Sequence, residues 1–375
     1  MSSELDEVLV TVAAGTARPP QLSDEESVEI AKAGDDQVFA MLFERHRSAI
    51  RRHCYRLVGS LSEAEDLTQD TYLRAWRKLA TFEGRASFLT WLYRIATNAA
   101  LDAIDDRKRR SLPTLMVPPA PHGSDEPEAG RTDSPWIDPF PEQSFDAIAG
   151  HDTDPSSILE SRQAVGLAFL CAIQCLPARQ RAVLILREVL HWSALEVAEL
   201  LQSTVPAVNS ALQRARSAID EVRSSNHEGV DRLEPISDEV KRTLARYIVA
   251  WEAADIDSLV ALLKDEATFS MPPSPTWYRG TQAIRLFLET VVFGPSGCHA
   301  RPGSTRALIT GASGQPALAV YQWNADEGVF RPFAIKVLAI EGSAIASVVS
   351  FTEAHLFALF GLPSALEAKS AGEQR

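Results

Sequence analysis

Residues 192–219 read WSALEVAELLQSTVPAVNSALQRARSAI, two short amphipathic segments joined by the polar turn QST at 202–204. Apolar residues recur in both segments at spacings of three and four, the period of a helix with one buried face. The residues expected to be buried are Leu195, Val197, Ala198, Leu200 and Leu201 in the first segment and Val208, Leu212 and Ile219 in the second. Two such helices around a short turn predict a helix-turn-helix.

The other side of the second helix is the informative one for function. A helix that reads DNA presents short polar side chains and arginine to base edges and phosphates in the major groove. Residues of this kind line its start and outer side: Ala207, Asn209, Ser210, Gln213, Arg214 and Arg216. The pattern favours DNA binding, and the alternative is a helix pair in a purely structural bundle.

A longer helical pattern lies upstream, between residues 23 and 110, where proline is absent. Within AEDLTQDTYLRAWRKL (64–79), Asp66, Gln69 and Asp70 share one polar strip, whereas Leu67, Leu73 and Trp76 are expected to face inward. The acidic strip is either a solvated surface or a contact for a partner.

Aromatic and basic residues alternate after the loop FEGRAS (82–87). The next helix carries Phe88, Trp91 and Tyr93 among Arg94 and Asn98, and it ends in a basic cluster formed by Arg107, Lys108, Arg109 and Arg110. Melted DNA needs this combination, because bases stack on rings while cations neutralise phosphates. Core packing is the competing explanation for each ring taken singly.

Composition shifts divide the chain. We expect a flexible N-terminus (1–22), a helical domain (23–110), an acidic proline-rich linker (111–157), a helix-turn-helix domain (158–223), a short linker (224–235), an α+β domain (236–360) and a tail (361–375). The linker's apolar residues Trp136, Ile137 and Phe140 either dock onto a partner groove or anchor the linker loosely.

Charge and cysteine usage limit the function classes. The net charge is −13, yet residues 39–110 hold 14 basic against 9 acidic residues, so the acidity lies outside the first helical domain. No signal peptide or membrane-spanning run is present, which predicts a cytoplasmic protein without membrane contact. The four cysteines form no C-x-x-C pair, so we expect no metal and no cofactor.

These blocks resemble a known family, the extracytoplasmic-function (ECF) sigma factors of the sigma-70 superfamily. AEDLTQDTYLRAW (64–76) and FEGRASFLTWLYRIATNAALDAI (82–104) are similar to its regions 2.2 to 2.4. Residues 176–219, from LPARQ to RSAI, are similar to its region 4. The resemblance implies a region 2 helical bundle and a region 4 helix-turn-helix, and it covers about half of the chain, in the family's order.

The resemblance also implies roles for individual residues. Asp66, Gln69 and Asp70 would contact the clamp helices of the largest subunit of core RNA polymerase. The −10 promoter element would be bound by Arg85, Ser87, Phe88, Trp91, Arg94 and Asn98, with the basic cluster 107–110 beside them. The −35 element would be read by Asn209, Ser210, Gln213 and Arg214, next to Ala207, with Arg216 on phosphate. The acidic linker would thread the polymerase cleft.

The last 140 residues depart from the minimal family pattern. Residues 240–280, with FLET (287–290) and the β-leaning runs 317–323, 333–340 and 345–351, resemble a SnoaL-like (NTF2-like) α+β cone, as in the actinobacterial group that includes mycobacterial sigma factor G. Such domains enclose an apolar pocket. Its candidate lining is Trp251, Phe269, Met271, Trp277, Tyr278, Phe287 and Trp323, residues that an ordinary core would also contain.

We therefore expect a sigma factor whose C-terminal domain contacts the sigma domains and modulates promoter output, and not an enzyme. Titratable candidates in that domain are Asp255, Asp257, His299, Glu353 and His355, with no Asp–His pair that the sequence alone can place. The rival hypotheses are a stand-alone helix-turn-helix regulator and a SnoaL-type cyclase or isomerase fused to a DNA-binding segment. The promoter consensus, any ligand, any anti-sigma factor and the oligomeric state stay open.

Overall fold

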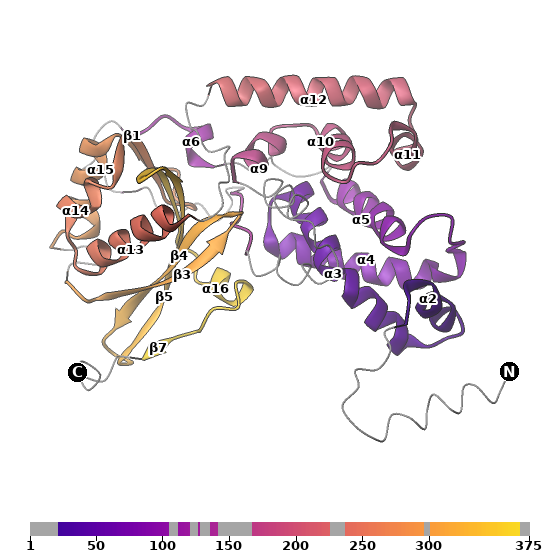
Figure 1. The fold of residues 1–375 in the computed structure, drawn as a ribbon, viewed down its shortest axis with the longest axis horizontal. Coiled ribbons are helices and arrows are strands. Elements are labelled where there is room, and N and C mark those ends of the chain that lie inside the picture. Colours follow the sequence, from indigo (N-terminus) through magenta and orange to yellow (C-terminus); the bar gives the residue numbers. More distant parts are fainter. Residues whose placement is uncertain are drawn as a thin grey trace.

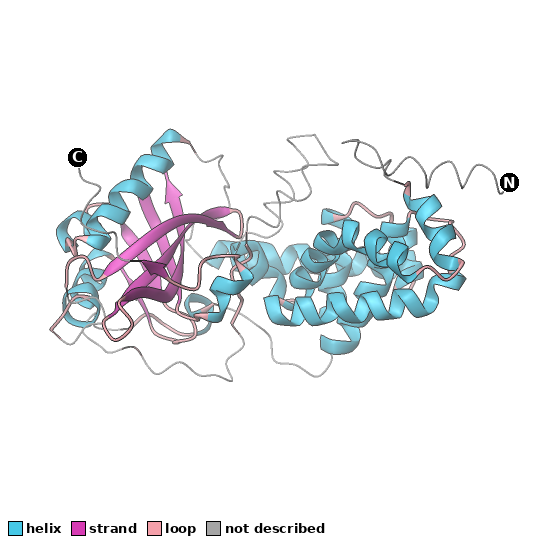
Figure 2. Cartoon of the chain, turned by 90° about the horizontal axis from the view of Figure 1, so that it is seen from below, coloured by secondary structure: helices cyan, strands magenta, loops and turns pink. Residues whose placement is uncertain are grey.

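The computed structural model describes residues 22–104, 112–120, 127, 136–141, 167–225, 237–295 and 301–367. Three parts follow one another (Figure 1): an N-terminal helical domain (22–104), a helix-turn-helix domain (167–225) and a C-terminal domain (237–367) with a mixed sheet. Figure 2 shows the sheet at one end of the molecule and the helical domains at the other. The predicted fold class is confirmed. Within these described ranges, no helix is both long and apolar enough to cross a membrane.

The N-terminal helical domain consists of α2 (Asp24–Lys32), α3 (Asp36–Val58), α4 (Leu61–Lys78), a 3₁₀ turn (Leu79–Thr81) and α5 (Phe88–Ile104). The ends of α3 follow from its sequence. Asp35 caps the start, because its carboxylate accepts hydrogen bonds from the Gln37 and Val38 amides at 3.0 Å. Gly59 ends the helix with a φ of 73°, a left-handed conformation that glycine adopts without strain.

Aromatic rings fill the core of this domain. The ring of Phe39 lies 5.2 Å from Tyr72 and 4.9 Å from Trp76, and a T-shaped contact joins it to Phe88 at 6.4 Å. The expectation that Leu73 faces inward is wrong, because its side chain is 48% exposed. Tyr72 and Trp76 occupy the buried face of α4, which turns the intervening Leu73 outward, beside the acidic strip.

The helix-turn-helix domain contains α9 (Leu167–Gln174), α10 (Ala178–Leu184), a π-helical turn (Ile185–Val189), α11 (Ala194–Leu200) and α12 (Val205–Ser225). Ser193 and Glu196 form a capping box that fixes the start of α11. Leu195 was expected to be buried but is 60% exposed. Val197, Ala198 and the C-cap Leu201 form the buried stripe, and Leu195 lies at its edge, where its side chain faces solvent.

The C-terminal domain has a seven-stranded sheet with helices on both faces. The helices on one face are α13 (Asp238–Glu252), α14 (Ile256–Val260) and α15 (Thr281–Phe287), continued by a π-helical turn (Leu288–Val292), and the helix on the other face is α16 (His355–Leu359). The strands are β1 (Leu263–Ser270), β2 (Trp277–Arg279), β3 (Thr305–Ala312), β4 (Gln315–Asn324), β5 (Val329–Glu341), β6 (Ala344–Phe351) and β7 (Leu366–Glu367). Their order is β2-β1-β6-β5-β4-β3, with β7 on β5; only β1 and β6 pair in parallel.

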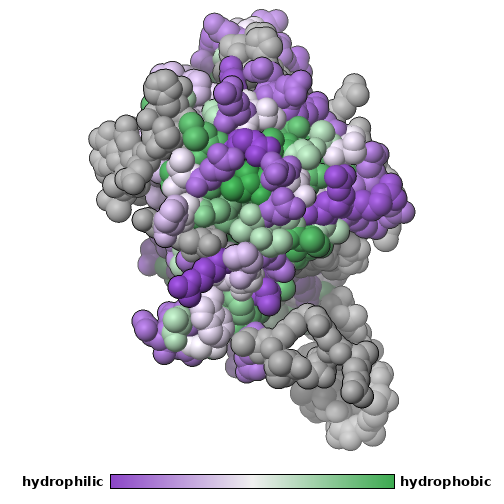
Figure 3. Space-filling model, turned by 90° about the vertical axis from the view of Figure 1, so that its left-hand side faces the viewer, coloured by the Kyte–Doolittle hydropathy of each residue, from purple (hydrophilic) through white to green (hydrophobic). Residues whose placement is uncertain are grey.

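The two faces of this sheet belong to different cores. Leu318, Val320 and Leu338 face α13 and α15 and form the interior of the C-terminal domain. On the opposite face, Tyr321 and Val337 belong to a cluster that continues into both helical domains. Figure 3 views the outer end of the C-terminal domain, where hydrophobic and hydrophilic side chains are intermixed. The sheet therefore serves both as the wall of an apolar interior and as a docking face for the helical domains.

Candidate nucleic-acid interface

The acidic strip lies on the surface of α4. Asp66 and Gln69 are exposed and Asp70 is half-buried, all on the side of the helix away from the aromatic core. Arg74 sits one turn further on and forms ion pairs with Asp70 at 2.8 Å and with Asp102 at 3.2 Å. The structure thus brings the three predicted residues together on one accessible face, with part of the charge of Asp70 balanced by Arg74.

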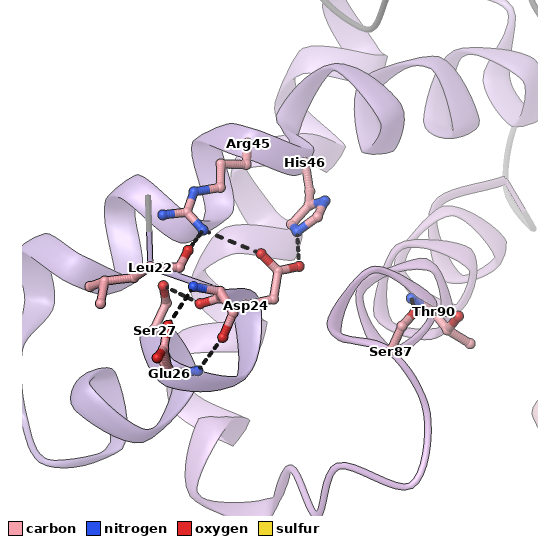
Figure 4. Close-up of polar contacts among 9 residues, drawn as sticks. Leu22, Asp24, Glu26, Ser27, Arg45, His46, Ser87 and Thr90 are labelled. Carbon is pink, nitrogen blue, oxygen red and sulfur yellow. Dashed lines mark hydrogen bonds and ion pairs between the residues drawn. The ribbon is translucent and has the colours of Figure 1, made fainter. Parts of the chain in front are cut away.

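The loop before α5 is supported by contacts between α2 and α3 (Figure 4). Asp24 accepts a hydrogen bond from Arg45 at 3.4 Å, and its other carboxylate oxygen lies 2.7 Å from the His46 ring nitrogen. The His46 ring in turn lies 5.8 Å from the Phe88 ring at the start of α5. Ser87 caps α5, since its hydroxyl accepts a hydrogen bond from the Thr90 amide at 3.1 Å.

The residues predicted for the −10 element separate into two groups. Arg85, Ser87 and Asn98 are exposed, and Arg85 pairs with Glu83. Phe88 is only 3% exposed, because its ring packs against Phe82 at 5.8 Å and against Trp91 at 5.6 Å. The Phe88 ring is therefore a core residue in this structure. Core packing was the competing explanation that the sequence left open for each ring. The basic cluster 107–110 lies outside the described residues.

Arg94 is engaged by the other helical domain. Its guanidinium lies 3.8 Å from the Glu199 carboxylate of α11 and 5.9 Å from the ring centroid of Trp192. A residue predicted to face promoter DNA thus contacts the helix-turn-helix domain instead. The sequence carries no signal for this pairing, because Arg94 and Glu199 lie in separate domains.

The outer face of α12 is open. The six residues predicted to face DNA are all exposed: Ala207, Asn209, Ser210, Gln213, Arg214 and Arg216. The helix buries Val208, Leu212, Ala215 and Ile219 on its other side. Arg216 pairs with Glu188 at 2.6 Å, so its charge is partly balanced within the domain. The amide of Ala207 donates to the Thr204 hydroxyl at 3.3 Å, which fixes the start of the helix.

Part of the predicted pocket lining lies in the interior of the C-terminal domain. Trp251, Phe269 and Tyr278 are buried there with Phe287, whose ring lies 5.4 Å from Phe269 and 4.4 Å from Tyr278. Lys336 is 1% exposed, and its amine lies over the Trp251 ring, 3.0 Å from the centroid. The interior beneath α13 therefore encloses the Lys336 amine together with the aromatic rings.

Two residues of the predicted lining lie elsewhere. Trp323 does not join the interior, because strand alternation places it on the opposite face, 38% exposed and 5.0 Å from the Phe330 ring. Trp277 is buried, but its indole nitrogen points to the linker and donates to the Val117 carbonyl at 2.8 Å. Partly buried Met271 packs at the edge of the interior.

Residues 136–141, which we call the linker clamp, join two domains. On the N-terminal domain, the Asp138 amide donates to the Gly59 carbonyl at 3.1 Å, and the Asp138 carboxylate accepts from the Leu61 amide at 2.7 Å. On the C-terminal domain, Phe140 exchanges hydrogen bonds with Ser313: its amide donates to the Ser313 hydroxyl at 2.9 Å, and the Ser313 amide donates back at 2.7 Å.

Hydrophobic contacts reinforce the linker clamp. Phe140 is fully buried, with its ring 4.7 Å from the Tyr55 ring and 5.8 Å from the Arg51 guanidinium. Ile137 is also fully buried, and Trp136 is 7% exposed. The sequence left open whether these apolar residues meet a partner or anchor the linker. The structure packs them within the chain, tightly rather than loosely.

A buried histidine in α3 gives the N-terminal domain a pH dependence. His53 is fully buried, and its ring Nε2 lies 2.8 Å from the Thr97 hydroxyl, which itself donates to the Tyr93 carbonyl. Because the Thr97 hydroxyl gives its one proton to Tyr93, it accepts a hydrogen bond from Nε2–H of His53. Burial, with a smaller contribution from nearby Arg56, lowers the pKa of His53 to about 3.

Acid is expected to destabilise this domain through His53. The unfolded state binds a proton near pH 6.5 and the folded state only near pH 3, so stability is complete above pH 6.5 and falls as the pH drops towards 3. At pH 5.5 the loss is about 1.4 kcal/mol. Urea unfolding of the full chain at pH 7.5 and 5.5 measures it, with His53→Phe as control. Equal pH sensitivity of the two proteins would count against the assignment.

Three known protein families match successive parts of this chain. Residues 42–110 match the family model for Sigma-70 region 2, residues 166–219 match Sigma-70, region 4, and residues 244–348 match the SnoaL-like domain. The ECF RNA polymerase sigma factor SigG of Mycobacterium tuberculosis is 44% identical over 330 residues, covering 88% of this chain and 85% of the relative. This chain belongs to the ECF sigma factors.

Two more distant relatives match different shares of this sigma factor. SigW of Bacillus subtilis is 28% identical over 192 residues, covering 51% of this chain and 92% of that protein. The crystal structure of SigJ from Mycobacterium tuberculosis matches with a TM-score of 0.55 at 19% identity, covering 87% of this chain and 99% of that one. The second likeness shows that the three-part fold has a counterpart in a solved structure.

Proposed function

We propose that this sigma factor binds core RNA polymerase through the acidic strip on α4, the −10 element through the surface at the start of α5, and the −35 element through the outer face of α12. The single observation that carries the proposal is the exposure of all six predicted residues on one side of α12. The other side of α12 is buried in the core, so its exposed side is the one that can enter a major groove.

The exposed side chains of α12 differ in which part of the DNA they can bind. Arg214 can form two hydrogen bonds with a guanine edge, and the amides of Asn209 and Gln213 suit adenine. Arg216 is better suited to phosphate, where its contact adds affinity for any sequence. At α5, the exposed Arg85, Ser87 and Asn98 are the residues available to unpaired DNA, with half-buried Trp91 beside them.

Substitution of Arg214 tests the −35 assignment. The Arg214→Ala variant is expected to weaken promoter binding by the polymerase complex about 5- to 150-fold and to relax selectivity at one or two base pairs. The Arg216→Ala variant is expected to weaken all sequences equally. Ser217→Ala, at an exposed position on the same helix, is the control. Binding to a set of −35 variants measures these effects; unchanged selectivity in Arg214→Ala would contradict the assignment.

We also propose that the C-terminal domain modulates promoter output through contact with the helical domains, without catalysis. Support comes from the linker clamp, which holds β3 and β4 next to the N-terminal domain. The four described titratable candidates lie outside the apolar interior: Asp255 caps α14, Asp257 is 85% exposed and pairs with Arg285, Glu353 is half-buried just before α16, and His355 is exposed. His299 lies outside the described residues.

A further inference from the structure

Lys336 places a primary amine inside the C-terminal domain. Among the residues that the structure describes, it is the one buried lysine. It lies on β5, directly opposite Leu318 of β4 and Ser350 of β6, and Leu318 belongs to the apolar interior. Directly opposed residues of antiparallel strands share a face of the sheet. The Lys336 side chain therefore points into that interior, next to the buried Ser350.

Two aromatic rings contact the Lys336 amine. The nitrogen lies 3.0 Å from the Trp251 ring centroid in α13 and 5.3 Å from the Phe269 ring centroid in β1. The face of an aromatic ring carries the negative part of its quadrupole, so both rings attract an ammonium ion. The site therefore combines one positive charge with an apolar, aromatic surrounding, and these two features suit a hydrocarbon chain that ends in an anionic group.

The backbone next to the Trp251 ring is irregular on both sides. Ala254, just after the end of α13, has a φ of 55°, a left-handed conformation that is strained for alanine. The ring also makes a T-shaped contact at 5.2 Å with Phe293, which directly follows the π-helical turn Leu288–Val292. Strained residues and π-helical turns recur at ligand sites. Both irregularities flank the ring that covers the Lys336 amine, so this part of the interior is the best suited to admit a ligand.

We propose that Lys336 binds the carboxylate of a small apolar acid, such as a medium-chain fatty acid, whose hydrocarbon chain packs among the rings beneath α13. The Trp251 ring moves off the amine, and an ion pair in an apolar surrounding replaces the cation–π contact. One ammonium balances one negative charge, which favours a carboxylate over a doubly charged phosphate. Binding of this kind is independent of the promoter contacts proposed above, and it makes an apolar acid the candidate effector of the C-terminal domain.

Decanoate and decanol test the proposal in the full-length protein, because they share a chain length and differ in charge. Isothermal titration calorimetry measures both affinities. The wild type is expected to bind decanoate about 10- to 150-fold more tightly than decanol, the range for one hydrogen bond to a charged group. Absence of decanoate binding, or equal affinity for the two compounds, would overturn the proposal.

The Lys336→Met variant removes the charge and keeps the length of the side chain. Its affinity for decanoate is expected to fall to its affinity for decanol, and retained decanol binding shows that the interior is still folded. Lys264→Met is the matched control, because Lys264 is an exposed lysine of the same domain that pairs with Glu341. This control should prefer decanoate as strongly as the wild type does. A decanoate preference that persists in Lys336→Met would refute the assignment.

Tryptophan fluorescence locates the carboxylate while Lys336 stays in place. The Trp251 ring covers the amine, so decanoate should change the emission of the wild type but not that of Trp251→Phe. The Trp323→Phe variant is the control, because Trp323 lies on the opposite face of the sheet, and it should respond as the wild type does. An equal emission change in Trp251→Phe would place the carboxylate away from Lys336 and contradict the proposal.

Discussion

A full-length protein carrying Asp66→Ala and Asp70→Ala is expected to bind core RNA polymerase at least about 30-fold more weakly than the wild type. Removing one side of a close charge pair in an interface costs about 2–5 kcal/mol, because the partner charge is left desolvated. Both carboxylates lie on the accessible side of α4, so folding should be affected by less than about 0.5 kcal/mol. Fluorescence titration of labelled sigma factor with core polymerase measures the affinity.

The control for this variant removes the same charge from the same domain. Glu25 and Asp36 are exposed acidic residues in the first turns of α2 and α3, away from the acidic strip. The Glu25→Ala, Asp36→Ala protein should keep its polymerase affinity. Equal weakening in both double variants would mean that general charge, rather than the acidic strip, drives association.

Removing the Phe140 ring is expected to release the linker clamp. A Phe→Ala change at a fully buried position costs about 3–5 kcal/mol, so local opening should become more than about 100-fold more frequent. The Asp138 amide, which donates to Gly59, reports this opening through hydrogen exchange. Run-off transcription should change in the same variant, because the C-terminal domain loses its attachment to the N-terminal domain.

Phe287→Ala is the matched control for the linker clamp. Phe287 is also buried, but it belongs to the interior of the C-terminal domain and not to the core that contains Phe140. Its loss should leave exchange at Asp138 unchanged. Slow exchange at Asp138 in Phe140→Ala, as in wild type, would show that the linker clamp does not depend on the ring.

Local patterns predicted much of the fold. The spacing of Val208, Leu212 and Ile219 placed the buried side of α12, and the apolar runs 317–323, 333–340 and 345–351 located β4, β5 and β6. Strands β1, β2, β3 and β7 were missed, and β7 lies within the segment that was expected to be a tail (361–375). The first half of β1 is LKDE and is largely exposed, and β3 is an edge strand, so neither shows the buried alternation that identifies a strand.

Contacts between domains could not be predicted in the same way. Phe140 meets Tyr55 and Ser313, and Arg181 meets Leu57, across more than 80 residues of sequence in each case. Periodicity reports which side of a helix or strand is buried, but it does not identify the surface that covers it. Arg94 shows the consequence: its place among aromatic residues indicated DNA contact, whereas its partner in the structure is Glu199.

Run-off transcription with purified core polymerase on a library of promoter fragments tests the central claim most directly. We expect start sites that require this protein, that share sequences at both the −10 and −35 positions, and that are lost in the Asp66→Ala, Asp70→Ala variant. Protein-dependent start sites that persist in that variant, or a folded full-length protein that binds core polymerase and selects no promoter, would contradict it.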